Sequence, residues 1–109
     1  MTQQNQTTPD PVLDPRLLLL SDKDNILVVL GAIQPGEFLM IEGQRVRVKR
    51  LIELGHKMAR TNIKPGDKVI KYGASIGSAT MEIECGDHVH LKNMKSDYTP
   101  TYALNGVAS

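Results

Sequence analysis

Residues 62–67 read Asn62-Ile63-Lys64-Pro65-Gly66-Asp67, and the same pattern returns as Ala32-Ile33-Gln34-Pro35-Gly36-Glu37 and as Glu82-Ile83-Glu84-Cys85-Gly86-Asp87. Each copy places an isoleucine before a two-residue turn opener, a glycine and an acid. Proline holds φ near about −65° and the glycine after it permits positive φ, which is the chemistry of a type II turn. Three such corners predict many short β segments, and their irregular spacing of thirty and then twenty residues excludes a solenoid.

Short strand-like runs surround these corners. Residues 17–20 and 26–33 are apolar runs separated by a polar turn, and residues 38–41 and 45–49 flank Glu42-Gly43-Gln44 as a hairpin. Residues 68–73 and 76–81 form two further runs around small turn residues. Residues 51–60 have mixed spacing, which suits either one helical turn or a loop. We therefore predict a mainly β domain with at most one or two short helical turns.

The length and composition predict one small cytoplasmic domain. The chain has 109 residues, of which 40% are hydrophobic, enough for one modest core. Its single cysteine, Cys85, cannot form an intramolecular disulfide, so the fold does not need an oxidising compartment. The net charge of +1 argues against a nucleic-acid partner. Neither apolar run, residues 17–20 or 26–33, is long enough to cross a membrane.

The sequence divides into a domain and two tails. Residues 1–15 contain three prolines and little apolar periodicity, which predicts a flexible N-terminal arm. The domain itself is expected over residues 16–95. Residues 96–109 form a polar tail that carries Tyr98 and Tyr102, and we expect this tail to dock on a partner surface.

The three histidines are the main candidates for chemistry. His88 and His90 are two residues apart, so a strand would place both rings on one face as metal ligands or as a proton-handling pair. The alternative is two half-exposed strand histidines, since a metal site usually needs a third or fourth ligand. His56 and Lys57 follow Gly55 and together suit a carboxylate-bearing acid, or else belong to an ordinary surface loop.

Two other features are interpreted as structural. Arg45, Arg47, Lys49 and Arg50 form a basic strip, which is typical of a solvated strand edge that discourages aggregation. A nucleic-acid track is the minor alternative, because no aromatic residues interleave with these charges. Cys85 stands where the other two copies have proline, and we interpret it as a space-filling residue and not a nucleophile.

Several motifs resemble one known family in the right order. They are Gly55-His56-Lys57-Met58-Ala59, residues 63–73, Ile76-Gly77 with Ala79, and Gly86-Asp87-His88-Val89-His90 with Asn93. Over residues 16–97 the chain resembles the SAF domain that opens altronate and related sugar-acid dehydratases. The same domain occurs as the separate small subunit of two-component enzymes, including sulfolactate sulfo-lyase. The resemblance implies a β-clip fold.

The resemblance also implies partners, a cofactor and site residues. It implies a large dehydratase subunit that carries most of the catalytic machinery, a small sugar-acid substrate, and iron or manganese in the holoenzyme; a homo-oligomer is compatible with it. Family members commonly carry a further histidine where this chain has Lys92, which shifts Lys92 toward an anion contact. The implied site residues are His56 and Lys57 for catalysis, Lys71, Lys92 and Asn93 for substrate, and His88 and His90 for metal.

We therefore expect the small subunit of a two-component sugar-acid hydro-lyase. In such a reaction a base removes the proton α to a carboxylate while a cation stabilises the enediolate. A domain this small lacks a roomy cleft of its own, so we expect the isolated chain to be inactive. The alternatives are a non-catalytic sugar-acid-binding or regulatory module, and a subunit of a sulfolactate sulfo-lyase-like carbon–sulfur lyase.

Overall fold

The computed structural model describes residues 13–97, and within them all regular secondary structure is β. The strands are β2 (Leu17–Leu18), β3 (Ile26–Val29), β4 (Phe38–Ile41), β5 (Gln44–Arg47), β6 (Lys57–Ala59), β7 (Lys68–Lys71), β8 (Ala74–Ala79), β9 (His88–Val89) and β10 (Met94–Lys95). The prediction of a mainly β fold is therefore confirmed. The stretch 51–60 forms a bridge, a turn and β6, which is the loop alternative and not a helical turn.

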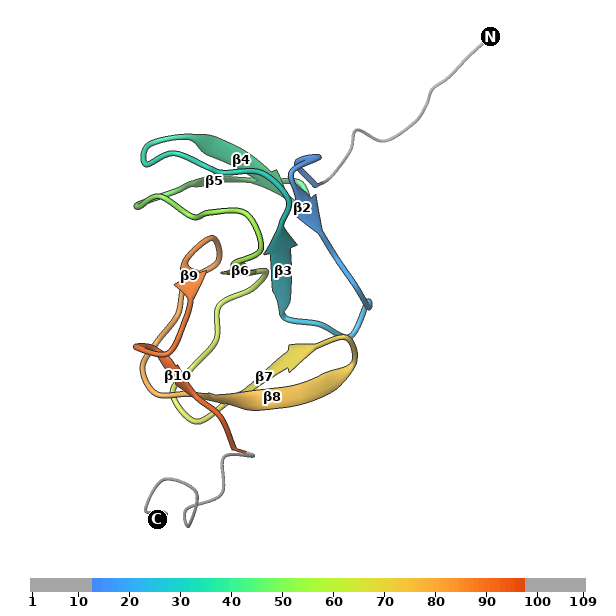
Figure 1. Ribbon diagram of the computed structural model, residues 1–109, viewed down its shortest axis with the longest axis vertical. Helices are drawn as coiled ribbons and strands as arrows, with labels where there is room; N and C mark the ends of the chain where they lie inside the picture. The colour runs from blue at the N-terminus through green and yellow to red at the C-terminus, as the bar shows by residue number, and fades with distance from the viewer. Residues whose placement is uncertain (1–12, 98–109) are drawn as a thin grey trace, which may run out of the picture.

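The strands form three small antiparallel sheets. A central sheet has the order β2-β3-β6-β9, the β4–β5 hairpin lies on one side of it, and a sheet of order β10-β8-β7 lies on the other (Figure 1). The first two strands are shorter than the apolar runs at residues 17–20 and 26–33 predict. After β3 the chain leaves the central sheet. Ile33 then pairs with Ile52 in an isolated bridge, and the first of the repeated turns follows.

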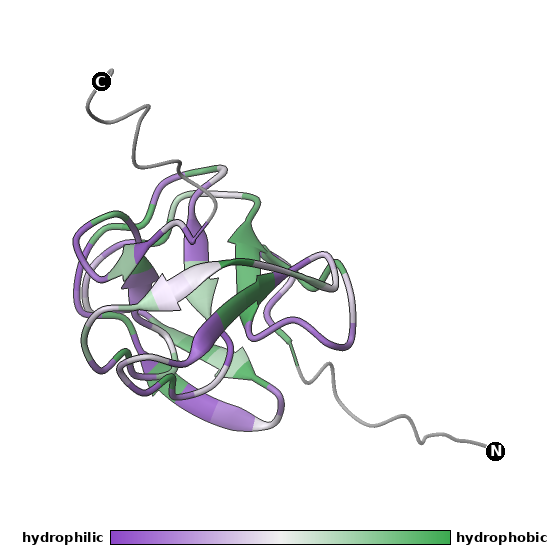
Figure 2. Ribbon diagram, turned by 90° about the horizontal axis from the view of Figure 1, so that it is seen from below, coloured by the Kyte–Doolittle hydropathy of each residue, from purple (hydrophilic) through white to green (hydrophobic). Residues whose placement is uncertain are grey.

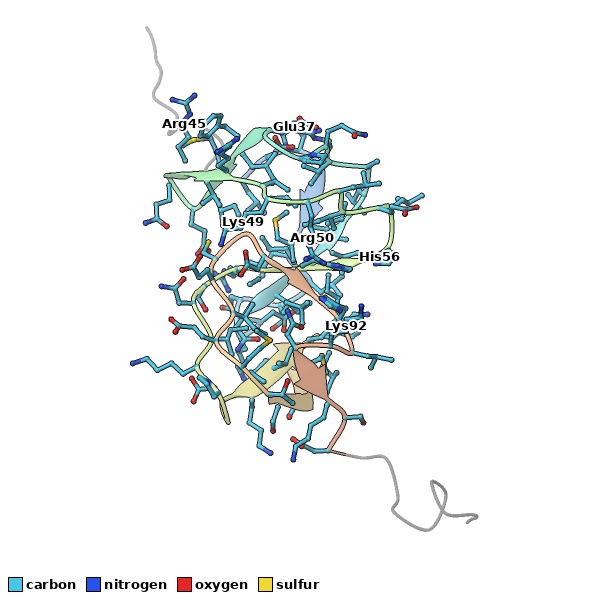
Figure 3. All side chains as sticks on the ribbon, turned by 90° about the vertical axis from the view of Figure 1, so that its left-hand side faces the viewer. Glu37, Arg45, Lys49, Arg50, His56 and Lys92 are labelled. Carbon is cyan, nitrogen blue, oxygen red and sulfur yellow. The ribbon has the colours of Figure 1, made fainter. Side chains whose placement is uncertain are left out.

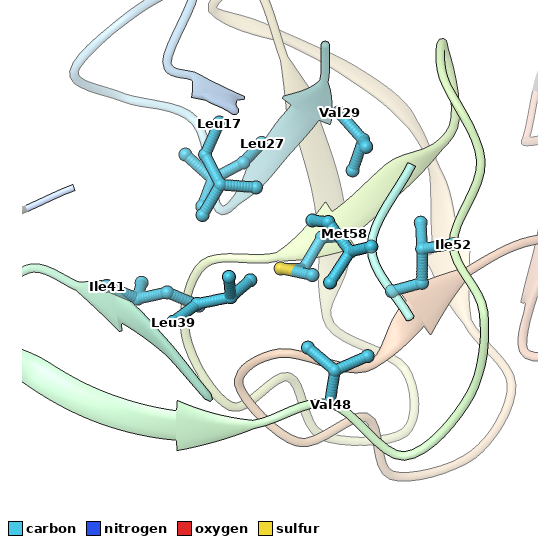
Figure 4. Close-up of a cluster of buried hydrophobic side chains, with 9 residues drawn as sticks. Leu17, Leu27, Val29, Leu39, Ile41, Val48, Ile52 and Met58 are labelled. Carbon is cyan, nitrogen blue, oxygen red and sulfur yellow. The ribbon is translucent and has the colours of Figure 1, made fainter. Parts of the chain in front are cut away.

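The central sheet separates two hydrophobic clusters. Alternation along β3 sends Leu27 and Val29 into the first cluster and Ile26 into the second. In β6, Met58 belongs to the first cluster and Ala59 to the second. Figure 4 shows Met58 in the middle of the first cluster. Figure 2 shows apolar stretches on the inner strands and hydrophilic residues in many of the peripheral loops.

The repeated six-residue pattern forms three similar turns. Its glycines have φ of 90°, 89° and 92° at Gly36, Gly66 and Gly86. In each turn the acid that follows the glycine accepts a hydrogen bond from the backbone N–H three residues earlier. The distance is 2.7 Å between Gln34 and Glu37 and is 3.2 and 3.0 Å in the second and third copies. The repeated acid therefore closes the turn, and the predicted turn chemistry is confirmed.

A buried carboxylate fixes the turn between β7 and β8. Asp24 is 2% exposed and accepts hydrogen bonds from the backbone N–H groups of Tyr72 and Gly73, at 2.8 and 2.7 Å. Both donors have positive φ, 57° for Tyr72 and 77° for Gly73. The paired hydrogen bonds hold Tyr72 in a backbone region that a bulky residue rarely adopts.

Both ends of the described chain contact the body of the fold. Leu13 pairs with Ile41, and the Asp97 carboxylate bonds Lys68 and Ser78. The rest of the predicted arm and tail lies outside the described residues, so the boundaries at 15 and 95 stay predictions. Residues 13–97 contain no helix long and apolar enough to span a membrane.

The close approach of β8 and β10 gives a stability prediction. A Cβ added at Gly77 would overlap the backbone carbonyl oxygen of Lys95. Gly77→Ala should therefore lower the free energy of unfolding by about 1–3 kcal/mol, measured by urea denaturation. Gly31→Ala is the control, because its Cβ would lie 3.6 Å from Arg16 in ordinary contact. Equal unfolding midpoints for the two variants would contradict this packing.

Candidate functional site

Three imidazoles lie together beside β9. His56 Nδ1 and His88 Nε2 are 2.9 Å apart, within hydrogen-bond distance, and the centroids of these rings are 5.0 Å apart. The rings of His88 and His90 are stacked, with centroids 4.6 Å apart and an angle of 27° between their planes. The pattern of alternate residues indicated a pair at His88 and His90, and the fold adds His56 to that pair.

The pairing of β6 with β9 explains this cluster. Met58 lies opposite His88 and Lys57 lies opposite Val89. Since successive strand residues point to opposite faces, His56, His88 and His90 share the face of Met58. Lys57 shares the opposite face with Val89, so it diverges from its sequence neighbour His56. Sequence adjacency alone suggested that the two side chains act together.

Lys57 and Lys71 do not line the cavity, although Lys57 is close enough to His88 to lower the pKa of that ring. Burial lowers the pKa of Lys57, and repulsion from Lys71 lowers this pKa further. The two ammonium groups are thus close enough to interact, and neither lines the cavity beside the histidines. The structure brings Lys92 and Asn93, but not Lys57 or Lys71, to that cavity; the substrate and catalytic roles of all four stay predictions.

The turn after β9 positions two of the rings. The Asn93 side chain donates to the His88 carbonyl at 2.8 Å and accepts from the His90 N–H at 2.9 Å. The Lys92 N–H donates to His90 Nδ1 at 3.2 Å. Asn93 therefore uses both ends of its amide to hold the turn. Because Nδ1 of His90 accepts, the neutral His90 ring carries its proton on Nε2.

A cavity of about 450 Å³ adjoins the cluster. It is lined by Lys49, Arg50, Ile52, Met81, Glu82, Gly86, Asp87, His88, His90, Lys92 and Asn93. Figure 3 shows Arg50, His56 and Lys92 grouped on one flank of the molecule. Arg50 thus belongs to the cavity and not to a solvated strand edge, because β5 ends at Arg47. The sequence indicated this end of the strand, because the alternation of charged and β-branched residues is lost at Lys49-Arg50.

The surroundings keep two of the imidazoles neutral. Burial, followed by repulsion from His90, His56, Arg50 and Lys57, lowers the pKa of His88 to about 4. Burial also lowers the pKa of His90, with Arg50 and Lys92 as the next causes. At neutral pH these rings are therefore bases that can accept a proton. The fixed positive charges beside them favour an anionic ligand.

The imidazoles offer few free lone pairs to a metal ion. His90 Nδ1 already accepts a backbone hydrogen bond, and its Nε2 carries the proton, so the neutral ring presents no lone pair to a metal. Arg50 and Lys92 also repel a cation. No group of three His, Cys, Asp or Glu residues between residues 13 and 97 is arranged to hold a metal ion. The rings as arranged do not fit a metal held by this chain alone, and ligation by His88 and His90 stays a prediction for the assembled enzyme.

The low pKa of His88 predicts a loss of stability in acid. The unfolded chain binds this proton near pH 6.5 and the folded chain only near pH 4, so stability falls as the pH drops through that window. Since the ring is only partly buried, solvent screening should limit the loss to about 1 kcal/mol or less. His88→Gln should reduce the change in urea midpoint between pH 7 and pH 4.5. An identical pH dependence in both proteins would show that this ring is not perturbed.

The chain is similar to known proteins over most of its length. The altronate/galactarate dehydratase SAF domain matches residues 15–97. Altronate dehydratase of Bacillus subtilis is 40% identical over 91 residues, covering 76% of this chain and 18% of that protein. Altronate dehydratase of Escherichia coli is 38% identical over 74 residues, covering 68% of this chain and 15% of that protein.

A smaller protein is also similar. The (2R)-sulfolactate sulfo-lyase subunit alpha of Paracoccus pantotrophus is 44% identical over 52 residues, which cover 48% of this chain and 78% of that subunit. The chain therefore spans a small part of the two altronate dehydratases and most of the sulfo-lyase subunit.

Proposed function

Because the chain belongs to the altronate/galactarate dehydratase SAF-domain family, we propose that it is the cytosolic small subunit of a two-component sugar-acid hydro-lyase. In this proposal a larger subunit completes the active site and the isolated chain is inactive. One observation carries the proposal. The three imidazoles lie together, and two of them, His88 and His90, line an open cavity with Arg50 and Lys92, which is a suitable place to bind an acid and move a proton.

In this proposal the cations and the imidazoles have separate roles. Arg50 and Lys92 pair with the acid group of the substrate, and a neutral imidazole accepts the proton on the adjacent carbon. The electron pair of that C–H bond forms the double bond as the bond to the β-hydroxyl breaks. The imidazolium then returns a proton to the departing hydroxide, so water leaves and the chain is unchanged. The hydrogen bond between His56 and His88 allows the proton to move between the two rings.

Exposed apolar side chains around the site support the proposal that a partner subunit covers it. Leu54 is 65% exposed and lies two residues before His56; Leu91 is 86% exposed and lies next to His90. Met81, at 53% exposure, lines the cavity. Large apolar side chains at the border of a polar cavity are typical of an interaction surface. In this proposal the iron or manganese of the holoenzyme is held chiefly by the larger subunit.

A second candidate differs only in the departing group. The match to the sulfo-lyase covers most of its alpha subunit, whereas the matches to the altronate dehydratases cover less than a fifth of each protein. This favours, as the alternative, a lyase that breaks a carbon–sulfur bond and releases sulfite. The cations beside the imidazoles suit a sulfonate as well as a carboxylate.

Reconstitution tests both candidates. The chain and the larger lyase subunit from the same organism are purified separately, then assayed alone and mixed, with aldonates and with sulfolactate. We expect activity only in the mixture, as loss of water from an aldonate. Sulfite release from sulfolactate without dehydration would select the second candidate. A larger subunit that is equally active without this chain would refute the proposed role.

A further inference from the structure

The β4–β5 hairpin has an open strand edge beside an exposed face. We propose that β5 binds an extended acidic segment of another protein as an added strand. This inference goes beyond the proposed function and does not rest on it, because the hairpin is separate from the histidine cavity. Figure 3 shows Arg45 near the top of the molecule, away from His56 and Lys92 on its flank.

The open edge belongs to β5. The Val48 N–H, directly after β5, donates to the Glu37 carbonyl of the other arm at 2.8 Å. Alternate residues of an antiparallel strand bond to the same neighbour, so the backbone groups of Arg45 and Arg47 point to the other edge. Between residues 13 and 97 no strand pairs with that edge. An open edge of this kind can accept a strand from another chain.

The fold closes two other strand edges with its own residues. At β4, the Asp14 N–H donates to the Met40 carbonyl at 2.8 Å, which covers the far edge of the hairpin. At β7, the Asn25 side chain donates to the Lys68 carbonyl at 2.8 Å and accepts from the Ile70 N–H at 2.7 Å. The described part of the chain provides no such cover for β5.

The exposed face beside this edge is both apolar and cationic. Phe38 of β4 is 52% exposed and lies opposite Arg47. Met40 is 38% exposed and lies opposite Arg45, whose guanidinium carbon is 4.2 Å from the centroid of the Phe38 ring. Within residues 13–97 neither arginine forms an ion pair. Arginines that only discouraged aggregation would not need exposed apolar neighbours, whereas an interaction surface commonly has them.

Charge decides between an acidic strand and a second copy of this chain. An added strand places alternate side chains on the exposed face, next to the two arginines of β5. Opposite charges on neighbouring strands stabilise a sheet, so carboxylates at alternate positions suit this edge. Pairing of β5 with β5 of a second copy would instead bring four arginines onto one face, where like charges repel.

Nucleic acid is the less suitable occupant. The structure divides the basic strip that the sequence contains: Glu84 neutralises Lys49 at 2.6 Å, and Arg50 lines the histidine cavity. Two arginines of the strip therefore remain on the hairpin, beside apolar side chains. Affinity for nucleic acid comes chiefly from many phosphate contacts, which two cations cannot supply.

Fluorescence anisotropy on the full chain at neutral pH and low salt tests this inference. The probe is a labelled synthetic peptide, blocked at both ends, in which glutamate alternates with valine. We expect saturable binding that Arg45→Gln weakens about fivefold, because one charge-assisted contact is lost. The matched control is Lys64→Gln, which removes an exposed cation outside the hairpin and should leave the affinity unchanged.

Modified peptides separate the backbone contacts from the charges. Methylation of the backbone amides should weaken binding about tenfold or more, because the peptide then cannot donate to β5. Equal affinity for the methylated peptide would overturn the added strand. The acidic partner is overturned if a lysine–valine peptide binds as tightly, if both variants behave alike, or if the acidic peptide does not bind.

Two outcomes would assign the surface to a different occupant and so contradict the proposal. One is tighter binding of a single-stranded oligothymidylate than of the acidic peptide, which would indicate nucleic acid. The other is a dimer of the chain, seen by sedimentation, that the acidic peptide dissociates, which would place a second copy at β5.

Discussion

Replacing His88 with glutamine should lower the kcat of the reconstituted lyase by about a hundredfold or more and change KM little. Loss of a general base typically costs about 10²–10⁴ in rate. His88 is the central ring of the cluster, bonded to His56 at 2.9 Å and stacked on His90 at 4.6 Å. Its low pKa keeps it neutral at the pH of the assay. Glutamine retains hydrogen-bonding capacity but cannot take up a proton.

Two control measurements exclude unfolding and a general effect of surface substitution as causes of the lower kcat. The urea midpoint of His88→Gln at pH 7 should match that of the unmodified chain, which excludes unfolding as the cause. Arg47→Gln serves as a surface control and should keep full activity, since Arg47 is exposed and does not line the cavity beside the histidines. A kcat within threefold of the unmodified enzyme would remove His88 from the chemistry.

Leu91→Asp should weaken association with the larger subunit by about thirtyfold or more. Apolar anchors at the centre of an interface cost about 2 kcal/mol or more when lost, which corresponds to this factor. Leu91 is 86% exposed although Asn93 holds the turn beside it, so the side chain is presented on a fixed backbone. The association is measured by sedimentation or by surface binding of the purified subunits.

The control for this variant is Tyr72→Asn. Tyr72 is 76% exposed at the turn of the β7–β8 hairpin, across the molecule from β9 (Figure 1). Asparagine tolerates the positive φ of 57° at this position. We expect normal association for Tyr72→Asn. Equal weakening in both variants, or none in Leu91→Asp, would place the interface elsewhere.

The turns and the hairpin of this fold could be predicted because the residues that determine a turn lie within a few positions of one another. The glycines at positions 36, 66 and 86 all adopt the positive φ that the repeated pattern requires. The hairpin around Glu42-Gly43 forms as β4 and β5. The sequence pattern contains the acid after each glycine, but it does not reveal the hydrogen bond that this acid accepts from the turn. An acid that closes a turn and an acid that only faces solvent look the same in the sequence.

The site was less predictable because it depends on strand pairing. His56 is 32 residues from His88 in sequence and meets it only through the register of β6 with β9. The same register turns Lys57 to the opposite face, which no local pattern reveals. Arg50 reaches the cavity because β5 ends three residues earlier. Such non-local pairings are where sequence patterns carry the least information.

The imidazole signals of the full chain, followed by NMR while a hydroxy acid is added, give the most direct test of whether the three rings form one acid-binding site. The signals of His56, His88 and His90 should shift together and saturate at a single dissociation constant, while Tyr72 stays unchanged. Independent shifts, or shifts that rise without saturation, would mean that the three rings do not share a ligand.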